Sequence, residues 1–290
     1  AAPGTIRAYD VRTGQLRWSF HTIPHPGVAG HESCPKDAWK DAGGANAWAG
    51  MALDDRRGIV YVPTGSAVDD FYGADRKGDN LFANSLLALD ARTGTRLWHF
   101  QAVHHDLWDR DLSSPPALVT VTRNGRRIDA VVQPSKQGFL YILDRVTGKP
   151  IFPIEERPVP ASNMQGEFAS PTQPFVATPA PFARQRLTAD MLTRRTPEAH
   201  EAALNAFAQM RSEGPFTPFT TKAPTVMFPG FDGGAEWGGP AIDRRRGILF
   251  INSNDVAWTG QLAARQTTSA IATAMSVRGA GLYEEQCSAC

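Results

Sequence analysis

The sequence has little net charge, no long apolar run and only three cysteines. Its 30 lysines and arginines against 29 aspartates and glutamates give a net charge of +1, so electrostatics provide no reason to expect nucleic acid or an anionic membrane as a partner. No stretch approaches the roughly 18 apolar residues of a membrane span. Residues 1–4 lack the charged and apolar regions of a signal peptide, which implies that an export signal was removed or lies upstream of a truncation. Cys34 has no partner that the sequence identifies.

Proline, glycine and hydrophobic residues are present in the amounts that an all-β globular protein needs. There are 22 prolines and 26 glycines, and 42% of the residues are hydrophobic. The chain can therefore bury a core, and its turns have the residues that turns require.

Two residue patterns recur along the chain and alternate with each other. The first pattern is Ala8, Asp10, Thr13, Gly14 and Trp18, then Ala88, Asp90, Thr93, Gly94 and Trp98, and in part Asp144, Thr147 and Gly148 with Phe152 in the Trp place. The second pattern is Trp48, Asp54, Arg56 and Gly58, then Trp237, Asp243, Arg245 and Gly247. Because the patterns interleave, one repeating unit carries both.

Each pattern predicts a β-hairpin. In residues 86–100 a β-prone run meets a turn from Asp90 to Gly94 and resumes as a second run. The Asp and Thr side chains can bond nearby backbone N–H groups, and Gly supplies the positive φ that closes the turn. Two hairpins per unit make a four-stranded blade, so we expect a partial β-propeller of roughly three blades, fewer than the roughly four to eight that close a ring.

Residues 153–234 break this pattern and are predicted to be an excursion from the propeller. They are rich in proline and aromatics up to Phe182, and then become helical, with Thr196 as N-cap, Pro197 at the first helical position and Gly214 as the stop. Such an excursion either lines the rim of a binding site or covers an exposed edge.

The C-terminal segment carries a Cys-x-x-Cys motif. Gly279, Leu282, Tyr283, Cys287 and Cys290 have the spacing that resembles the first helix of a class I cytochrome c domain. There a histidine follows the second cysteine and ligates haem iron. The resemblance implies haem c attached through both cysteines if a histidine follows. A redox dithiol, a disulfide or half a zinc site are the alternatives.

Residues 4–258 resemble the pyrroloquinoline quinone (PQQ)-dependent dehydrogenases, most closely the membrane-bound glucose dehydrogenase branch. The matching stretches include residues 5–11, 104–109, 133–138, 171–175 and 228–239. The resemblance implies an eight-bladed propeller that holds PQQ and a divalent ion, Ca²⁺ or Mg²⁺, near its axis. It also implies oxidation of a sugar or alcohol, with electrons passed to a cytochrome or ubiquinone.

Two residues match the catalytic positions of that family. Asp109, in Leu-Trp-Asp, matches the catalytic base, which takes the hydroxyl proton as hydride leaves the substrate carbon, and it is the candidate metal ligand of this chain. Lys136 matches the cation that contacts the quinone oxygens. Without the resemblance, Asp106, Asp109 and Asp111 could merely solvate a loop, and Lys136 could be an exposed lysine.

Two further residues match cofactor-binding positions, and a third, Glu236, lies nearby in the sequence. Trp48 matches the tryptophan on which PQQ stacks, although its place in the second pattern leaves a blade-packing role open. Asn252 matches an asparagine at the PQQ edge, and Glu236 is expected to help orient the site. A departure from the alcohol-oxidising branch is Ser66, which stands where that branch has a metal-ligating asparagine.

The predicted organisation is a partial propeller over residues 1–258, followed by a linker and the start of a cytochrome c-like domain over 259–290. The favoured function is PQQ-dependent oxidation of a glucose-like aldose in the periplasm, with the fragment alone inactive. Two alternatives stay open. One is a quinohaemoprotein alcohol dehydrogenase, and the other is a cofactor-free propeller that acts as a protein-binding scaffold.

Overall fold

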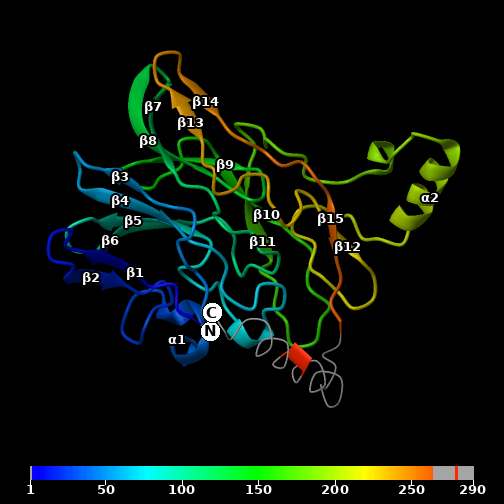
Figure 1. Cartoon of the computed structure of the whole chain (residues 1–290), viewed down its shortest axis with the longest axis horizontal. Helices are drawn as coiled ribbons and strands as arrows, with labels where there is room; N and C mark the ends of the chain where they lie inside the picture. The colour runs from blue at the N-terminus through cyan, green and yellow to red at the C-terminus, as the bar shows by residue number, and fades with distance from the viewer. Residues whose placement is uncertain (1, 264–277, 280–290) are drawn as a thin grey trace.

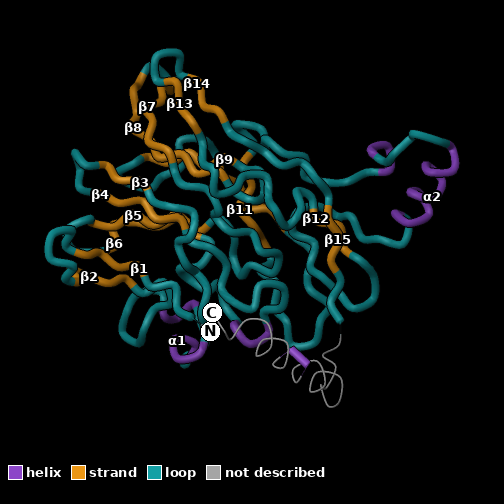
Figure 2. Tube along the Cα trace, viewed as in Figure 1, coloured by secondary structure: helices purple, strands orange, loops and turns teal. Residues whose placement is uncertain are grey.

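We describe the protein from a computed structural model, which places residues 2–263 and 278–279. The described chain consists mainly of small antiparallel sheets that fan out from the middle of the molecule, as Figures 1 and 2 show. The all-β prediction is confirmed. None of the helices in the described ranges is long and apolar enough to cross a bilayer.

The sheets are formed in chain order with few crossovers. They are β1 (Ile6–Tyr9) with β2 (Leu16–Phe20); β3 (Ala52–Asp54), β4 (Ile59–Pro63), β5 (Ser85–Asp90) and β6 (Arg96–Gln101); β7 (Ala117–Arg123), β8 (Arg126–Pro134) and β9 (Leu140–Asp144); β10 (Ile154–Pro158) with β11 (Thr172–Val176); β12 (Thr225–Met227) with β15 (Trp258–Gly260); and β13 (Ala241–Asp243) with β14 (Ile248–Phe250). The helices are α1 (Ala38–Asp41) and α2 (Pro197–Phe207), with 3-10 turns η1 (His31–Ser33), η2 (Ala74–Arg76) and η3 (Ala189–Met191).

The sheet β3–β6 is a complete four-stranded blade. The second sequence pattern supplies the hairpin β3–β4, and the first supplies β5–β6, so the predicted combination of the two patterns is confirmed. Side chains alternate between the faces of the sheet, and both faces are buried. Leu86 and Ala88 belong to one hydrophobic cluster, whereas Leu87 and Leu89 belong to another.

The repeated tryptophans join neighbouring blades. Trp18 Nε1–H donates to the Ala91 carbonyl (3.0 Å), and Trp98 Nε1–H donates to the Arg145 carbonyl (3.3 Å). Each indole lies over the turn glycine of the next hairpin, where a Cβ would sit 2.6 Å from the ring, at Gly94 and Gly148. These glycines have φ of +74° and +70°, so both their conformation and the indole require the absence of a side chain.

Charged side chains tie the same blades together. Asp54, on β3, accepts from Arg57 and from Arg145, each at 2.9 Å. Arg57 also donates to Asp129 of β8 at 2.6 Å. Asp54 is buried, and the network fixes one blade against the next.

The excursion is only partly as predicted. Thr196 caps α2 by accepting from the Ala199 N–H at 3.1 Å, and Pro197 stands at the first helical position, as expected. The helix ends at Phe207, however, well before Gly214. The excursion also contains the hairpin β10–β11 and strand β12, and its residues Val176, Phe216, Phe219 and Met227 belong to the main hydrophobic cluster. Hydrophobic contacts with the blades therefore incorporate much of this segment into the core.

Candidate active site

The loop between β6 and β7 is folded around a buried carboxylate. Asp106 accepts from the Trp108 N–H (2.9 Å) and the Arg110 N–H (2.6 Å), which closes residues 106–110 into a tight turn. Asp109 adopts a φ of +56° inside this turn, a conformation that few non-glycine residues take. The turn directs the Asp109 side chain toward the loop between β8 and β9, where Lys136 lies.

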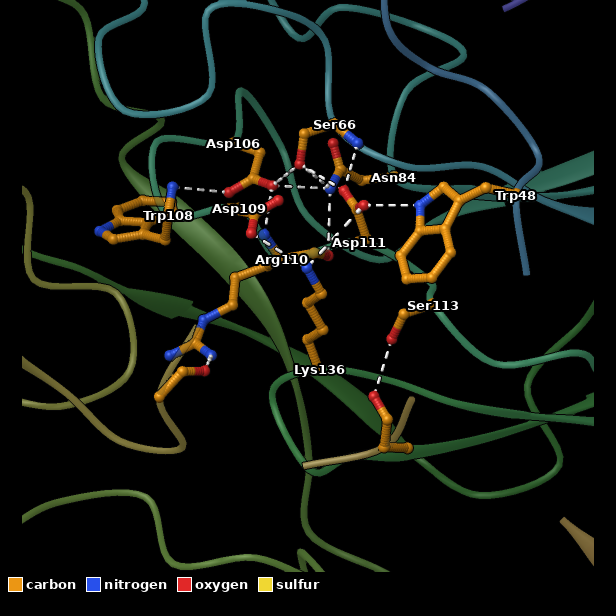
Figure 3. Close-up of polar contacts among 12 residues, drawn as sticks. Trp48, Ser66, Asn84, Asp106, Trp108, Asp109, Arg110, Asp111, Ser113 and Lys136 are labelled. Carbon is orange, nitrogen blue, oxygen red and sulfur yellow. Dashed lines mark hydrogen bonds and ion pairs between the residues drawn. The ribbon is translucent and has the colours of Figure 1, made fainter. Parts of the chain in front are cut away.

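Asp109 and Lys136 form an ion pair at the predicted site. Lys136 Nζ lies 3.0 Å from Asp109 Oδ2 and 3.9 Å from Asp111 Oδ2 (Figure 3). Lys136 is 5% exposed, so it is not an ordinary surface lysine. Its backbone is fixed because its carbonyl accepts from the Gly234 N–H at 2.7 Å.

Burial and neighbouring charges together set the pKa values of this pair. Desolvation and the neighbouring Asp111 raise the pKa of Asp109 to about 7, against the opposing effect of Lys136. Burial lowers the pKa of Lys136, but Asp111 and Asp109 together outweigh it, and the net shift is upward. The site therefore holds an ammonium beside a carboxyl group that titrates near neutral pH.

Trp48 borders the ion pair. Its Nε1–H donates to Asp111 Oδ2 at 2.8 Å, and Lys136 Nζ lies 5.7 Å from its ring centroid. The residue is 41% exposed. Trp48 is therefore not a blade-packing residue in this structure, and its indole presents open surface next to Lys136.

Ser66 and Asn84 hold the two flanking aspartates, and neither was predicted to be part of the site. Ser66 donates to Asp111 Oδ1 through its N–H (2.5 Å) and its hydroxyl (2.8 Å), and the hydroxyl also contacts Asp106. Asn84 Nδ2 donates to Asp106 Oδ2 at 2.8 Å. Asp106 and Asp111 are 2% and 8% exposed, so they are buried supports of the site and do not solvate a loop. In the sequence, the Asp-x-x-Asp-x-Asp spacing could have identified Asp106 and Asp111 as part of the site.

The remaining predicted residues make fewer contacts with the site. Glu236 is partly buried, and desolvation raises its pKa. The positive charge of Lys136 opposes this rise but does not cancel it. Asn252 is exposed and has no hydrogen bond with any described residue, so its contact with a cofactor stays a prediction. Cys287 and Cys290 lie outside the described residues.

The predicted metal site is not assembled by the described part of the chain. Within residues 2–263 and 278–279, no three His, Cys, Asp or Glu side chains are grouped as metal ligands. Asp109 Oδ2 is occupied by Lys136. The donor set does not fit a divalent ion by itself, and metal ligation by Asp109 stays a prediction.

The large cavity of the structure lies away from the predicted site residues. A cavity of about 690 Å³ lies among strands β3, β7, β8, β9, β13 and β14, and none of the predicted site residues lines it. We assign the site by its chemistry, because buried, paired and pKa-shifted groups converge at Asp109 and not in that cavity.

Comparison with known proteins identifies the family. A family model described as the β-propeller domain of glucose/ethanol/alcohol dehydrogenase (PQQ) matches residues 1–288. The chain belongs to the PQQ-dependent dehydrogenases. The partial propeller is thereby confirmed.

Individual relatives of this family differ in their substrates. The quinoprotein glucose dehydrogenase of Escherichia coli is 34% identical over 96% of this chain and 34% of its own length. A quinate/shikimate dehydrogenase (quinone) of Acinetobacter baylyi is 37% identical over 86% of this chain and 30% of its own length. The chain thus spans about a third of the length of these curated relatives.

A solved structure supports the fold alone. The quinohaemoprotein alcohol dehydrogenase of Comamonas testosteroni superposes with a TM-score of 0.60 at 23% identity, over 89% of this chain and 34% of that one.

The residues present fit part of a PQQ site. PQQ is a flat, anionic tricycle, and the structure offers an open indole at Trp48 beside the buried ammonium of Lys136. Trp48 and Lys136 are the residues that would hold it, with Glu236 nearby.

Proposed function

We propose that the protein to which this chain belongs is a PQQ-dependent dehydrogenase that oxidises a neutral aldose such as glucose. The observation that carries the proposal is the Asp109–Lys136 pair at 3.0 Å, in which the buried Lys136 and the partly buried Asp109 lie beside the open ring of Trp48. A carboxyl group with a pKa of about 7 is suited to accept a proton at neutral pH. A scaffold propeller would have no need for such a group.

The chain's own residues supply proton transfer and charge. Asp109 accepts the proton of the substrate hydroxyl, and Lys136 keeps a share of Asp109 ionised near neutral pH. Lys136 also places a positive charge beside the position where the quinone would bind. When bound, PQQ supplies the two-electron acceptor for the hydride that leaves the substrate carbon.

The substrate and the electron pathway belong to the same proposal. The name of the Escherichia coli relative and the resemblance to the glucose dehydrogenase branch support an aldose, and Ser66 in place of the asparagine of the alcohol branch agrees with it. We further propose a divalent ion, Ca²⁺ or Mg²⁺, with Asp109 among its ligands, and electron transfer to ubiquinone or to a c-type haem at Cys287 and Cys290. We also propose a periplasmic location.

The test uses the full-length protein reconstituted with PQQ. Asp109→Asn should retain PQQ, measured by its absorbance, while dye reduction with glucose falls about 10²- to 10⁴-fold. The control is Asp75→Asn, an exposed carboxylate on η2, which should leave turnover unchanged. Normal turnover of Asp109→Asn would exclude Asp109 as the base.

Wild-type activity separates the alternative functions. A preference for ethanol over glucose would favour an alcohol dehydrogenase. A protein that binds no PQQ and oxidises neither sugars nor alcohols would favour the scaffold.

A further inference from the structure

The loop between β4 and β5 brings a carboxylate that has no partner among the described residues, and an aromatic ring, to the edge of the site. These are Asp70 and Phe71, which the sequence analysis did not single out. We propose that Asp70 and Phe71 bind the substrate, Asp70 by accepting hydrogen bonds from its hydroxyl groups and Phe71 by packing against its C–H face. This inference rests on the proposed function and specifies its substrate class.

The backbone of this loop is tied to the catalytic turn. Arg76 is 4% exposed, and its guanidinium donates to the Asp69 carbonyl from Nε (3.1 Å) and Nη2 (2.8 Å). The same Nη2 also donates to the Asp106 carbonyl. One buried guanidinium therefore bridges residue 69 and the turn that carries Asp109.

The other end of the loop is held from a different side. The Tyr72 hydroxyl donates to the Gln165 carbonyl at 2.7 Å, and the Gly73 N–H donates to Glu167 Oε1 at 3.1 Å. Gly73 also packs against His105, since a Cβ there would sit 2.3 Å from Nε2. With both ends fixed, the position of Asp70 and Phe71 is determined before any ligand binds, which reduces the entropy lost on binding.

Asp70 differs from the other carboxylates around it. Asp106, Asp109 and Asp111 each have hydrogen-bond or ionic partners, whereas the half-buried Asp70 carboxylate has none among the described residues. The groups that act on it electrostatically are those of the site, namely Asp111, Asp106, Arg76 and Lys136. A half-buried carboxylate with all its acceptor positions free is suited to receive hydroxyl donors from a ligand.

Phe71 is supported on one side and open on the other. Its ring meets Phe219 (5.7 Å, 81°) and Phe231 (5.3 Å, 72°) edge to face, yet the residue is 38% exposed. Phe231 belongs to the loop whose Gly233 packs on Lys136, where a Cβ would sit 2.5 Å from Lys136 Cγ. The aromatic ring is therefore anchored to the same loop that contacts the catalytic lysine.

This combination selects a neutral polyhydroxy substrate. Such a molecule offers several hydroxyl donors to a carboxylate and a C–H surface to an aromatic ring. A hydroxy acid would bring its own carboxylate next to the carboxylate of Asp70, and like charges repel at this range. We therefore expect neutral aldoses and polyols to be preferred over substrates of the quinate type.

The experiment compares Asp70→Asn and Phe71→Ala with Asp69→Asn in the full-length, PQQ-loaded protein. Asp69 is the adjacent exposed aspartate, and only its carbonyl is used by Arg76. Asp70→Asn should raise KM for glucose about tenfold or more, since a charged acceptor is lost, with kcat changed less than about threefold. Phe71→Ala should do the same and Phe71→Trp should restore the KM, while Asp69→Asn stays like wild type.

Specificity gives a second readout. The ratio of kcat/KM for glucose over that for quinate should fall in Asp70→Asn, because the repulsion of a carboxylate is removed. Equal KM and an equal ratio in Asp70→Asn and wild type would overturn the inference.

Calorimetric titration separates this inference from the proposed function. Glucose, xylose and glycerol are titrated into each PQQ-loaded variant. Weaker binding to Asp70→Asn than to Asp69→Asn supports the inference even where wild type turns over none of these compounds, an outcome that would overturn only the proposed function. Binding that is equal in all variants, or absent in wild type, overturns the inference.

Discussion

The fold shifts the pKa of the aspartates in the blade turns and the pKa of Asp109 in opposite directions. Asp10 and Asp90 are solvent-accessible, and the pKa of each is lowered because the carboxylate accepts hydrogen bonds from backbone N–H groups of its own turn. Asp109 is partly buried beside Asp111, and its pKa is raised to about 7. The same residue type therefore stabilises a turn in one place and provides a carboxyl group with a pKa near neutral pH in the other.

The difference arises from where the partners come from. A turn aspartate bonds N–H groups two and three residues away, as Asp90 does with Arg92 and Thr93 at 2.9 Å. Asp109 depends on Lys136, which lies in another loop, and on Asp111, which Trp48 and Ser66 hold. Local hydrogen bonds form the repeated turns, whereas the raised pKa of Asp109 requires several loops to converge.

The largest test of this comparison removes the distant partner of Asp109. Lys136→Met in the full-length protein should lower kcat about 10²- to 10³-fold at pH 7, as loss of one stabilising donor does. Because Lys136 lowers the pKa of Asp109, its loss should raise that pKa. The rise of kcat/KM with pH should then shift to higher pH, measured as a pH–rate profile.

Lys136→Arg is the matched control, since it retains a positive charge. It should keep the profile nearer to that of wild type. A profile that is identical in Lys136→Met and wild type would show that Asp109 does not titrate in the reaction.

The next test acts on the blades alone. Trp98→Ala removes an indole that is 8% exposed and covers Gly148 of the next hairpin. It should lower the free energy of unfolding by about 3–5 kcal/mol, the usual range for a large buried aromatic. Measured by urea denaturation, this loss should leave the pH–rate profile of the folded enzyme unchanged. A shifted profile would mean that the blades and the site are not separable.

The same contrast explains what could be predicted from the sequence. The hairpins were predictable because the Asp-to-Gly turns and their glycines act over a few residues, and the complete blade β3–β6 follows from two adjacent patterns. Asp109 and Lys136 were found through the family resemblance, and their separation of 3.0 Å was not predictable. Ser66, Asn84 and Asp70 were missed as site residues because their roles come from contacts with loops distant in sequence. The hairpin β10–β11 was missed because prolines and polar residues obscure its alternation.

A smaller effect should appear in the pH dependence of stability. The pKa of Asp109 is raised on folding from 3.8 to about 7, so the folded state binds more protons between these values. Its contribution to stability is complete below about pH 4 and is lost as the pH rises through about 7. Wild type should lose on the order of 3 kcal/mol from this group between pH 4.5 and 7.5.

Two variants isolate that contribution in urea denaturation. Asp109→Asn should remove this part of the pH dependence. Asp90→Asn should keep it, because the contribution of a carboxylate with a lowered pKa is present above its unfolded pKa and is lost only as the pH falls below it. Equal slopes for wild type and Asp109→Asn would contradict the raised pKa.

The smallest expected effect lies outside both regions. Helix α2 projects away from the blades (Figure 1), and Thr196 caps it through a single exposed hydrogen bond of 3.1 Å to Ala199. Thr196→Ala should destabilise the helix by about 1 kcal/mol, seen as faster amide exchange in its first turn, and Thr196→Ser should restore protection. Because no described contact links this cap to Asp109 or Lys136, kcat and KM should stay at wild-type values. A changed KM would show that the excursion takes part in substrate binding. Helix α2 would then belong to the site and not to a separate region.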